Sequence, residues 1–125
     1  MNSQTTNTVI LVTGHERREM VRQALLEFGS EFRNRVEKAS QIFIHPNLVS
    51  AINQLVCTHV DAVRGVLDHI SLITNREVLI GDAGVHNTKE AFENFDYPSL
   101  ARSGNIKLVD LNDDETIESY AYTSS

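Results

Sequence analysis

The chain has 125 residues with a formal net charge of -6, and it is 41% hydrophobic and 22% charged. This length suits one domain, 1–125, that can bury roughly two-thirds of its unfolded surface, and the composition excludes global disorder. There is no apolar run of the roughly 20 residues that a membrane span needs, no secretory leader and no basic face for a phosphate backbone, so we expect a cytoplasmic protein that binds neither membranes nor nucleic acid.

The first elements predicted along the chain are a strand and a long helix. Residues 1–7 are polar, and we expect them, like about 119–125, to be flexible. Val9–Val12 is continuously apolar, which is typical of a parallel strand covered on both faces. Apolar residues then recur at helical spacing between Val21 and Val36, and Gly29 predicts a kink or a division into two helices.

The second strand is predicted at Ile42–Ile44, a short apolar run that Pro46 ends. Residues 49–56 mix apolar and amide side chains, and fit a short strand, an irregular helix or a lid equally well. Thr58 then predicts the start of a helix, because Asp61 stands at the reciprocal position of a capping box. The buried stripe expected for this helix is Val60, Val63, Leu67 and Ile70.

Two more strands and one helix complete the pattern. Val78–Ile80 is the third predicted strand. Asn87 or Thr88 caps the next helix, which Tyr97 ends because the residue before proline avoids helical geometry. Ile106–Val109 is the fourth strand. The alternation of strands and helices predicts an α/β fold, a three-layer Rossmann-like sandwich whose mostly parallel sheet has about four or five strands, with 117–122 as a candidate edge strand.

Polar residues follow each predicted strand. In open α/β sheets, ligands bind at the carboxyl ends of the strands, so we expect a binding wall there. Asn47 would orient a ligand by paired hydrogen bonds, His45 would act as a ligand or an acid–base group, and Asp82 would bind a metal or orient a histidine. The full set of ligand-binding candidates is His45, Asn47, Thr58, Asp82 and Gly84.

Three kinds of chemistry are compatible with this rim. A divalent metal could be held by His45, His59, Asp82 and His86, which are suitable ligand types but form no closely spaced motif. The turn from Gly81 to Gly84 could present helix N–H groups to an anion, or could simply need the backbone freedom of glycine.

The third kind is nucleophilic catalysis by Cys57 with His59, against which a small buried thiol is the simpler interpretation. The pattern identifies no catalytic residue and leaves open whether the protein is an enzyme. His69, in the middle of a helix, is interpreted as structural or exposed. Cys57 is the only cysteine, so the chain has no internal disulfide and cannot by itself supply the four thiolates of an iron–sulfur cluster.

Several motifs together resemble the domain-of-unknown-function 362 family over about residues 8–118. They are IFIHPNLVS at 42–50, THVDAVRGVLDHI at 58–70, VLIGDAGVHNTKEAFENFDYPSLA at 78–101 and KLVDLNDDE at 107–115. Some members of that family bind iron–sulfur clusters, so the resemblance implies a redox-related role. Members usually carry a lysine before Pro-Asn, where this chain has His45.

The resemblance also implies that a family domain continues into a second half, so the chain is expected to be half of a larger domain. A sheet meant to be continued exposes an apolar edge or face, and we therefore expect a homodimer or a second chain that completes the domain. The alternative is a non-catalytic interaction or structural half-domain in which the same polar residues serve turns and caps.

Overall fold

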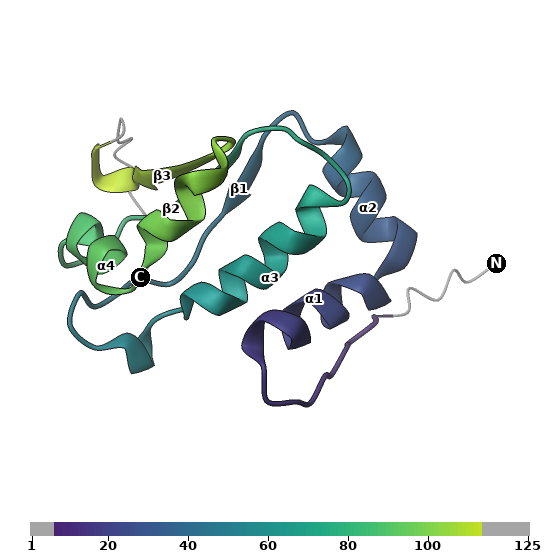
Figure 1. The fold of residues 1–125 in the computed structure, drawn as a ribbon, viewed down its shortest axis with the longest axis horizontal. Coiled ribbons are helices and arrows are strands. Elements are labelled where there is room, and N and C mark those ends of the chain that lie inside the picture. The colour runs from purple at the N-terminus through teal and green to yellow at the C-terminus, as the bar shows by residue number, and fades with distance from the viewer. Residues whose placement is uncertain (1–6, 114–125) are drawn as a thin grey trace, which may run out of the picture.

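The computed structural model describes residues 7–113, so the predictions for 1–6 and for the chain after 113, including the edge strand over 117–122, lie outside the described residues. Figure 1 shows the arrangement of the elements. In chain order they are α1 (Arg17–Glu27), α2 (Gly29–Lys38), β1 (Ile42–Ile44), η1 (Gln54–Val56), α3 (Val60–Ser71), β2 (Val78–Asp82), α4 (Thr88–Asn94), η2 (Tyr97–Ser103), β3 (Ile106–Asp110) and η3 (Leu111–Asp113), where η marks a 3-10 helix. Within 7–113 no helix has both the length and the apolar character that crossing a bilayer requires.

The three strands form one parallel sheet with β2 in the centre. The register pairs Ile44 with Ile80, and Ile80 with Leu108. Parallel neighbours need a crossover connection, which α3 supplies between β1 and β2, and α4 with η2 supplies between β2 and β3. The α/β class is therefore confirmed, but the described sheet has three strands and not the predicted four or five.

The strand predicted at Val9–Val12 is wrong. These residues form no strand, and the side chains of Val9 and Leu11 are 89% and 88% exposed. The following helix, α1, packs against α3 and not against the sheet, so the apolar run lies on the side of α1 away from the strands (Figure 1). An apolar run becomes a strand only where a neighbour satisfies its backbone, and no described strand pairs with this one.

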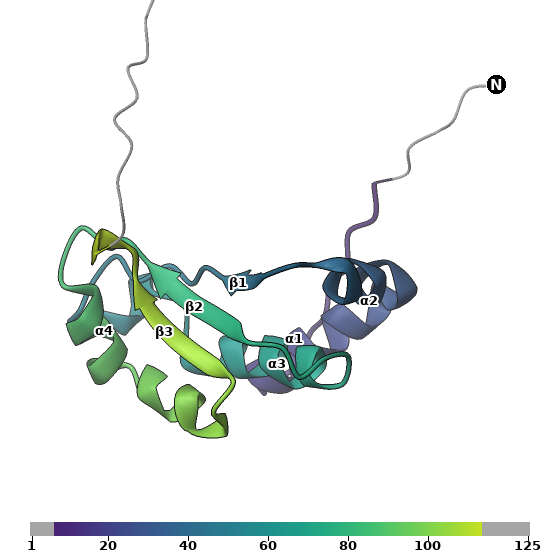
Figure 2. The same cartoon turned by 90° about the horizontal axis from the view of Figure 1, so that it is seen from above.

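Helices cover only one face of the sheet. In Figure 2, α3, α4 and η2 all lie below it. The covered face carries Val78 and Ile80, which are 2% and 0% exposed. On the opposite face Phe43 is 40% exposed and Lys107 is exposed. Helices thus cover one face of the described sheet and not both, as the predicted three-layer sandwich requires, because α1 packs against α3 instead of on the free face of the sheet (Figure 2).

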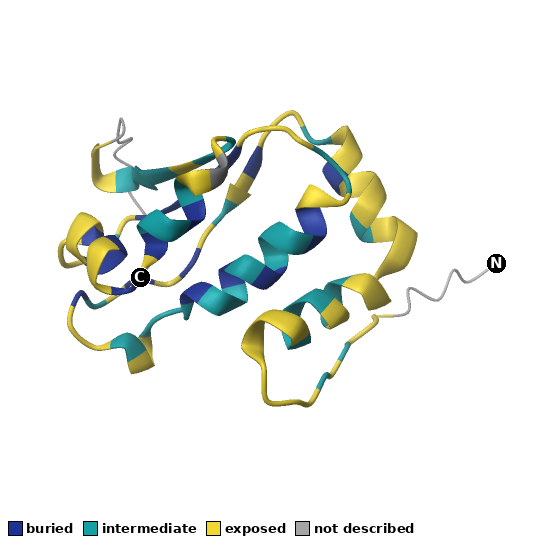
Figure 3. Ribbon diagram, in the orientation of Figure 1, coloured by how far each residue is buried: buried dark blue, intermediate teal, exposed yellow. Residues whose placement is uncertain are grey.

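The hydrophobic core fills the space between the sheet and the helices, where the buried residues of Figure 3 gather. The predicted stripe of α3 is confirmed at Val60, Val63 and Ile70, which are buried, while Leu67 is half-buried. The largest fully buried side chain is Tyr97, at 0% exposure. The core is therefore formed mainly by the chain from β1 onward. Of the first two helices, only α2 contributes a buried residue, Val36.

Local signals placed most helix ends well. The long N-terminal helix divides at Gly29, whose φ of 55° is a left-handed conformation that glycine tolerates best. Asn87 caps α4, since its Oδ1 accepts a hydrogen bond from the backbone N–H of Glu90. The cap of α3 differs from the prediction: His59, not Thr58, is the capping residue, because the Thr58 hydroxyl is engaged elsewhere.

Candidate functional site

The carboxyl ends of β1 and β2 bring together His45 and Asp82. Because Ile44 pairs with Ile80, the residues that follow on each strand lie side by side. His45 Nε2 and Asp82 Oδ1 are 2.7 Å apart. Their exposure differs sharply, since the imidazole is 64% exposed and the carboxylate 12% exposed. The pair therefore consists of a fixed inner carboxylate and an outer ring that faces solvent.

Asp82 is held by two backbone groups as well as by the histidine. Its Oδ2 accepts from the N–H of Leu48 at 2.7 Å, and its Oδ1 accepts from the N–H of Ala83 at 2.8 Å. Burial by itself raises the pKa of Asp82, but the hydrogen bonds from His45, Leu48 and Ala83 outweigh it and hold that pKa below its ordinary value. The carboxylate is thus ionised at neutral pH and can accept a hydrogen bond from the Nε2–H of His45.

The ionised carboxylate defines the state of the His45 ring. A carboxylate accepts hydrogen bonds and donates none, so the neutral imidazole carries its proton on Nε2 and leaves a lone pair on Nδ1. The protonated ring donates from both nitrogens. With Nε2 bound to Asp82, the outer part of the ring is the part that can meet a ligand or a proton donor.

Asn47 and Thr58 also meet, but their polar groups mainly hold the chain. The N–H of Asn47 donates to Thr58 Oγ1 at 2.9 Å, and the N–H of Thr58 donates to the Asn47 carbonyl at 2.8 Å. Asn47 Nδ2 donates to the carbonyl of Val56 at 3.2 Å, and the Tyr97 hydroxyl donates to the carbonyl of Thr58 at 2.9 Å. These hydrogen bonds hold the two ends of the loop between β1 and α3 close to each other, next to His45 and Asp82.

Gly84 lies where the turn after β2 touches the segment after β1. A Cβ atom at this position would be 2.8 Å from the carbonyl oxygen of Leu48 and 3.1 Å from Thr88 Oγ1. Its N–H donates to Thr88 Oγ1, and its carbonyl accepts from Asn112. The glycine is therefore required for close packing, and the geometry favours the tight-turn interpretation over an anion site.

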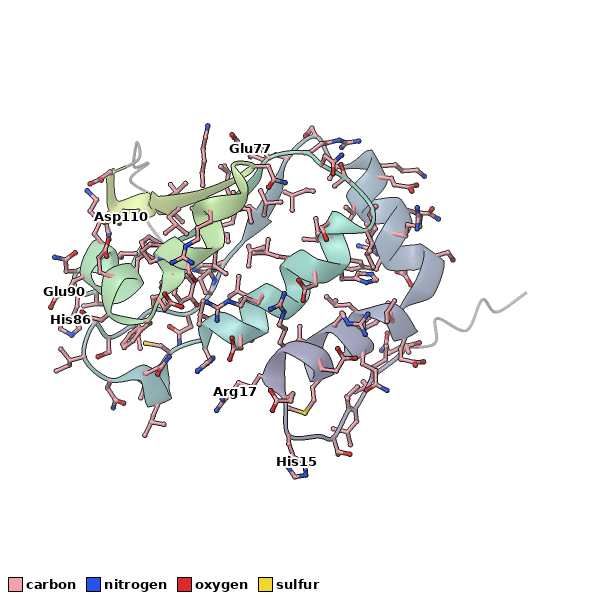
Figure 4. The ribbon with its side chains drawn as sticks, viewed as in Figure 1. His15, Arg17, Glu77, His86, Glu90 and Asp110 are labelled. Atoms are coloured by element: carbon pink, nitrogen blue, oxygen red, sulfur yellow. The ribbon has the colours of Figure 1, made fainter. Side chains whose placement is uncertain are left out.

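The four candidate metal ligands do not form a cluster. His59 Nδ1 accepts a hydrogen bond from the N–H of Asp61 and so caps its own helix. His86 is exposed and lies beside Glu90 at the start of α4, whereas His15 lies at the far corner of the molecule (Figure 4). Across residues 7–113, no group of three or more His, Cys, Asp or Glu side chains could hold a metal ion.

Cys57 is half-buried, and its thiol donates to the carbonyl of Ser50 at 3.2 Å. Since the ring of His59 is occupied by its capping bond, the geometry favours a structural thiol over a nucleophile paired with histidine. His69 is indeed structural: it is 7% exposed and its ring packs against Phe32 at a tilt of 46°, with ring centroids 5.3 Å apart.

Sequence reasoning missed a shallow cavity on this side of the molecule. Its volume is about 320 Å³, and it is lined by Ser50, Ala51, Ile52, His86, Asn87 and Glu90. It also missed the role of Tyr97, which the pattern marked only as the end of a helix. No sequence signal identified either feature, because both depend on how the loops after β1 and β2 approach one another.

A chain with a three-stranded parallel sheet, helical crossovers and polar groups at its carboxyl edge belongs to the α/β class. A family model for a domain of unknown function, DUF362, matches residues 42–123, which is more than half of the chain, so the protein belongs to the DUF362 family. No curated protein and no solved structure matches the chain. The match includes every candidate site residue and begins at β1, whereas α1 and α2 precede it.

Proposed function

We propose that the carboxyl edge of the sheet is one wall of a binding site for a small ligand, with His45 as the group that contacts it. The observation that carries this proposal is the contact between the exposed imidazole and the buried carboxylate of Asp82, at 2.7 Å with exposures of 64% and 12%. A histidine that served only packing would not need an ionised partner behind it.

The chemistry of this pair suits a ligand with a hydroxyl or a carboxylate group. Asp82 orients the ring by accepting a hydrogen bond from Nε2. A neutral His45 accepts a hydrogen bond from a hydroxyl at Nδ1, and a protonated His45 donates one to a carboxylate. The same geometry would let His45 act as an acid–base group in a reaction, with Asp82 as a positioning residue.

Ligand screening by NMR tests this proposal. The backbone amide signals of residue 45 and its neighbours are followed while a panel of small hydroxy acids, carboxylates and sugars is added. We expect some members to shift those signals, His45→Gln to abolish the effect, and the matched variant His86→Gln to retain it. His86 is an appropriate control because it is an exposed histidine outside the Asp82 contact. If no member of the panel shifts the His45 signals, or if binding survives in His45→Gln, the proposal fails.

A second candidate function is partner binding, and exposed apolar side chains favour it. Ile52 and Leu55 in the loop after β1 are 88% and 95% exposed, and Val85 after β2 is 86% exposed. Large apolar side chains gathered in two neighbouring loops are typical of interaction surfaces. The partner would be a second copy of this chain or another protein chain, seated so that it closes the binding wall.

Sedimentation equilibrium tests the homodimer at tens of micromolar. We expect a dimer that the double variant Ile52→Ser, Leu55→Ser weakens, while Val9→Ser, equally exposed but remote from these loops, leaves it unchanged. A monomer at that concentration contradicts the homodimer.

A further inference from the structure

A second cavity lies on the helical side of the molecule, between α3 and η2. Its volume is about 370 Å³, which falls in the usual range for small-molecule sites. It reaches Val78 and Ile106, the first residues of β2 and β3, so it lies at the amino ends of the strands. It shares no lining residue with the carboxyl edge around His45 and Asp82, and the proposed function does not use it.

The floor of this cavity is apolar. Ile70, Val78 and Leu100 line it and are 4%, 2% and 6% exposed, and the half-buried Leu67 and Ile106 complete it. These side chains already belong to or pack against the hydrophobic core, so the floor is rigid. A ligand that rests on this floor must present an apolar body.

The rim of the cavity is rich in arginine. Arg18, Arg64 and Arg102 line it, which is three of the eight arginines in a chain whose net charge is -6. Only one acidic residue, Asp68, is among the lining residues. This rim is therefore an exception to the acidic character of the chain and points to an anionic group on the ligand.

Two of the arginines are held in place by hydrogen bonds to neighbouring side chains. Arg18 makes a two-pronged bond to Asp68, at 2.5 and 2.7 Å. Arg64 donates to Asp61 at 2.6 Å, to Asp96 at 2.7 Å and to Ser99 Oγ at 2.6 Å. A guanidinium has five N–H donors, so each retains donors that these bonds do not use. The carboxylates thus fix the direction of the remaining donors without exhausting them.

The same carboxylates define the charge of the ligand. Asp61, Asp68 and Asp96 form ion pairs with Arg18 and Arg64, whereas Arg102 forms no ion pair with a described residue and can meet one negative charge. A multiply charged group such as a phosphate dianion would meet no further excess of positive charge. A single carboxylate, which a guanidinium binds through directed N–H donors, matches the site better.

We propose that this cavity binds a monocarboxylate with an apolar body, such as a medium-chain fatty acid or an aryl carboxylate. Its carboxylate binds Arg64 and Arg102, and its apolar body lies on Leu67, Ile70 and Leu100. The occupant is a small molecule and no covalent step is involved.

Octanoate is a suitable probe, and octylammonium, which has the same apolar body and the opposite charge, is the matched control. Backbone amide signals of the full chain are followed by NMR during each titration. We expect octanoate to shift the signals of α3 and η2, and octylammonium to leave them unchanged. If octanoate shifts no signal of the cavity, or if octylammonium binds as well as octanoate, the proposal is overturned.

Variants test the role of the rim. Arg102 is exposed, so Arg102→Gln leaves the fold intact, and we expect it to weaken octanoate binding about tenfold or more, the loss of one charge-assisted hydrogen bond. Arg17→Gln is the matched control, because Arg17 is exposed and lies outside the cavity at the start of α1 (Figure 4). Equal binding by wild type and Arg102→Gln, or equal weakening in Arg17→Gln, overturns the assignment of the carboxylate to this rim.

Discussion

Replacement of Asp82 by alanine separates the structural from the ligand-facing part of the candidate site. The carboxylate is the acceptor for the N–H of Leu48, a residue that is only 1% exposed. Without it that buried N–H loses its acceptor, which costs about 1–3 kcal/mol. The N–H of Ala83 belongs to an exposed residue and can turn to water, and the contact with the largely exposed His45 is worth about 1 kcal/mol or less.

We therefore expect Asp82→Ala to lower the free energy of unfolding by about 2 kcal/mol, and His45→Ala to lower it by less than about 1 kcal/mol. Urea denaturation followed by far-ultraviolet circular dichroism at pH 7 measures both values. Asp82→Asn is the matched control, because it retains an oxygen that can accept from Leu48, and it should lose less than Asp82→Ala. Equal losses in Asp82→Ala and His45→Ala, or no loss in Asp82→Ala, would refute this account of the site.

The pH dependence of the same measurement reports on Asp82. Its folded-state pKa lies below the ordinary value of 3.8, so the folded state binds fewer protons than the unfolded state in this range. The carboxylate therefore contributes stability above the ordinary pKa, and this contribution is lost as the pH falls through the folded-state pKa. Asp82→Asn should not show this loss, and a wild-type profile identical to that of the variant would contradict the assignment.

Three further predictions concern closely packed groups in α3 and η2. Burial lowers the pKa of His69, and Arg22 and Arg33 act in the same direction, so the stability of the protein should fall as the pH drops below the ordinary value of 6.5. Both ring nitrogens lack a hydrogen-bond partner among the described residues, so His69→Leu should unfold at higher urea and lose this pH dependence. Lower stability of the variant at pH 6 would contradict this prediction. Tyr97→Phe removes the bond to the Thr58 carbonyl and should cost about 1 kcal/mol in the same urea assay, against no loss if water replaces the hydroxyl. Gly65→Ala would place a Cβ atom 2.4 Å from the Arg18 carbonyl oxygen, so α1 should separate from α3. The backbone amides of α1 should then lose protection from hydrogen exchange. Unchanged protection would show that α1 shifts without detaching.

Much of the candidate site could be inferred from strand ends alone. The short run before His45 and the run before Asp82 each end in polar residues, and parallel strands bring such ends to one edge. That reasoning identified both members of the pair. It gave no means to separate ligand-facing from structural groups, because Asn47 and Thr58 carry equally suitable side chains. Their hydrogen bonds to each other are contacts between residues 11 positions apart, which no local pattern encodes.

The predicted metal site also shows how far residue spacing alone can predict a site. His45, His59 and His86 are each near a strand end or a helix start, so their spacing alone allowed convergence. The structure turns the His59 ring into a helix cap and leaves His86 exposed on a separate loop. The direction of the His59 ring is decided by the backbone N–H of Asp61, and residue type alone does not indicate this contact.

The sequence by itself determined the helices α1 to α4, the division at Gly29, the cap at Asn87 and three parallel strands, because periodicity, glycine conformation and capping act within a few residues. Only the tertiary structure decided that Val9–Val12 is not a strand, that the helices cover a single face of the sheet, and that Asp82 is buried behind an exposed His45. The physical reason is that a strand, a layer and a buried charge are each defined by distant neighbours. An apolar run or an acidic side chain has the same local sequence pattern whether or not residues distant in the sequence pack against it.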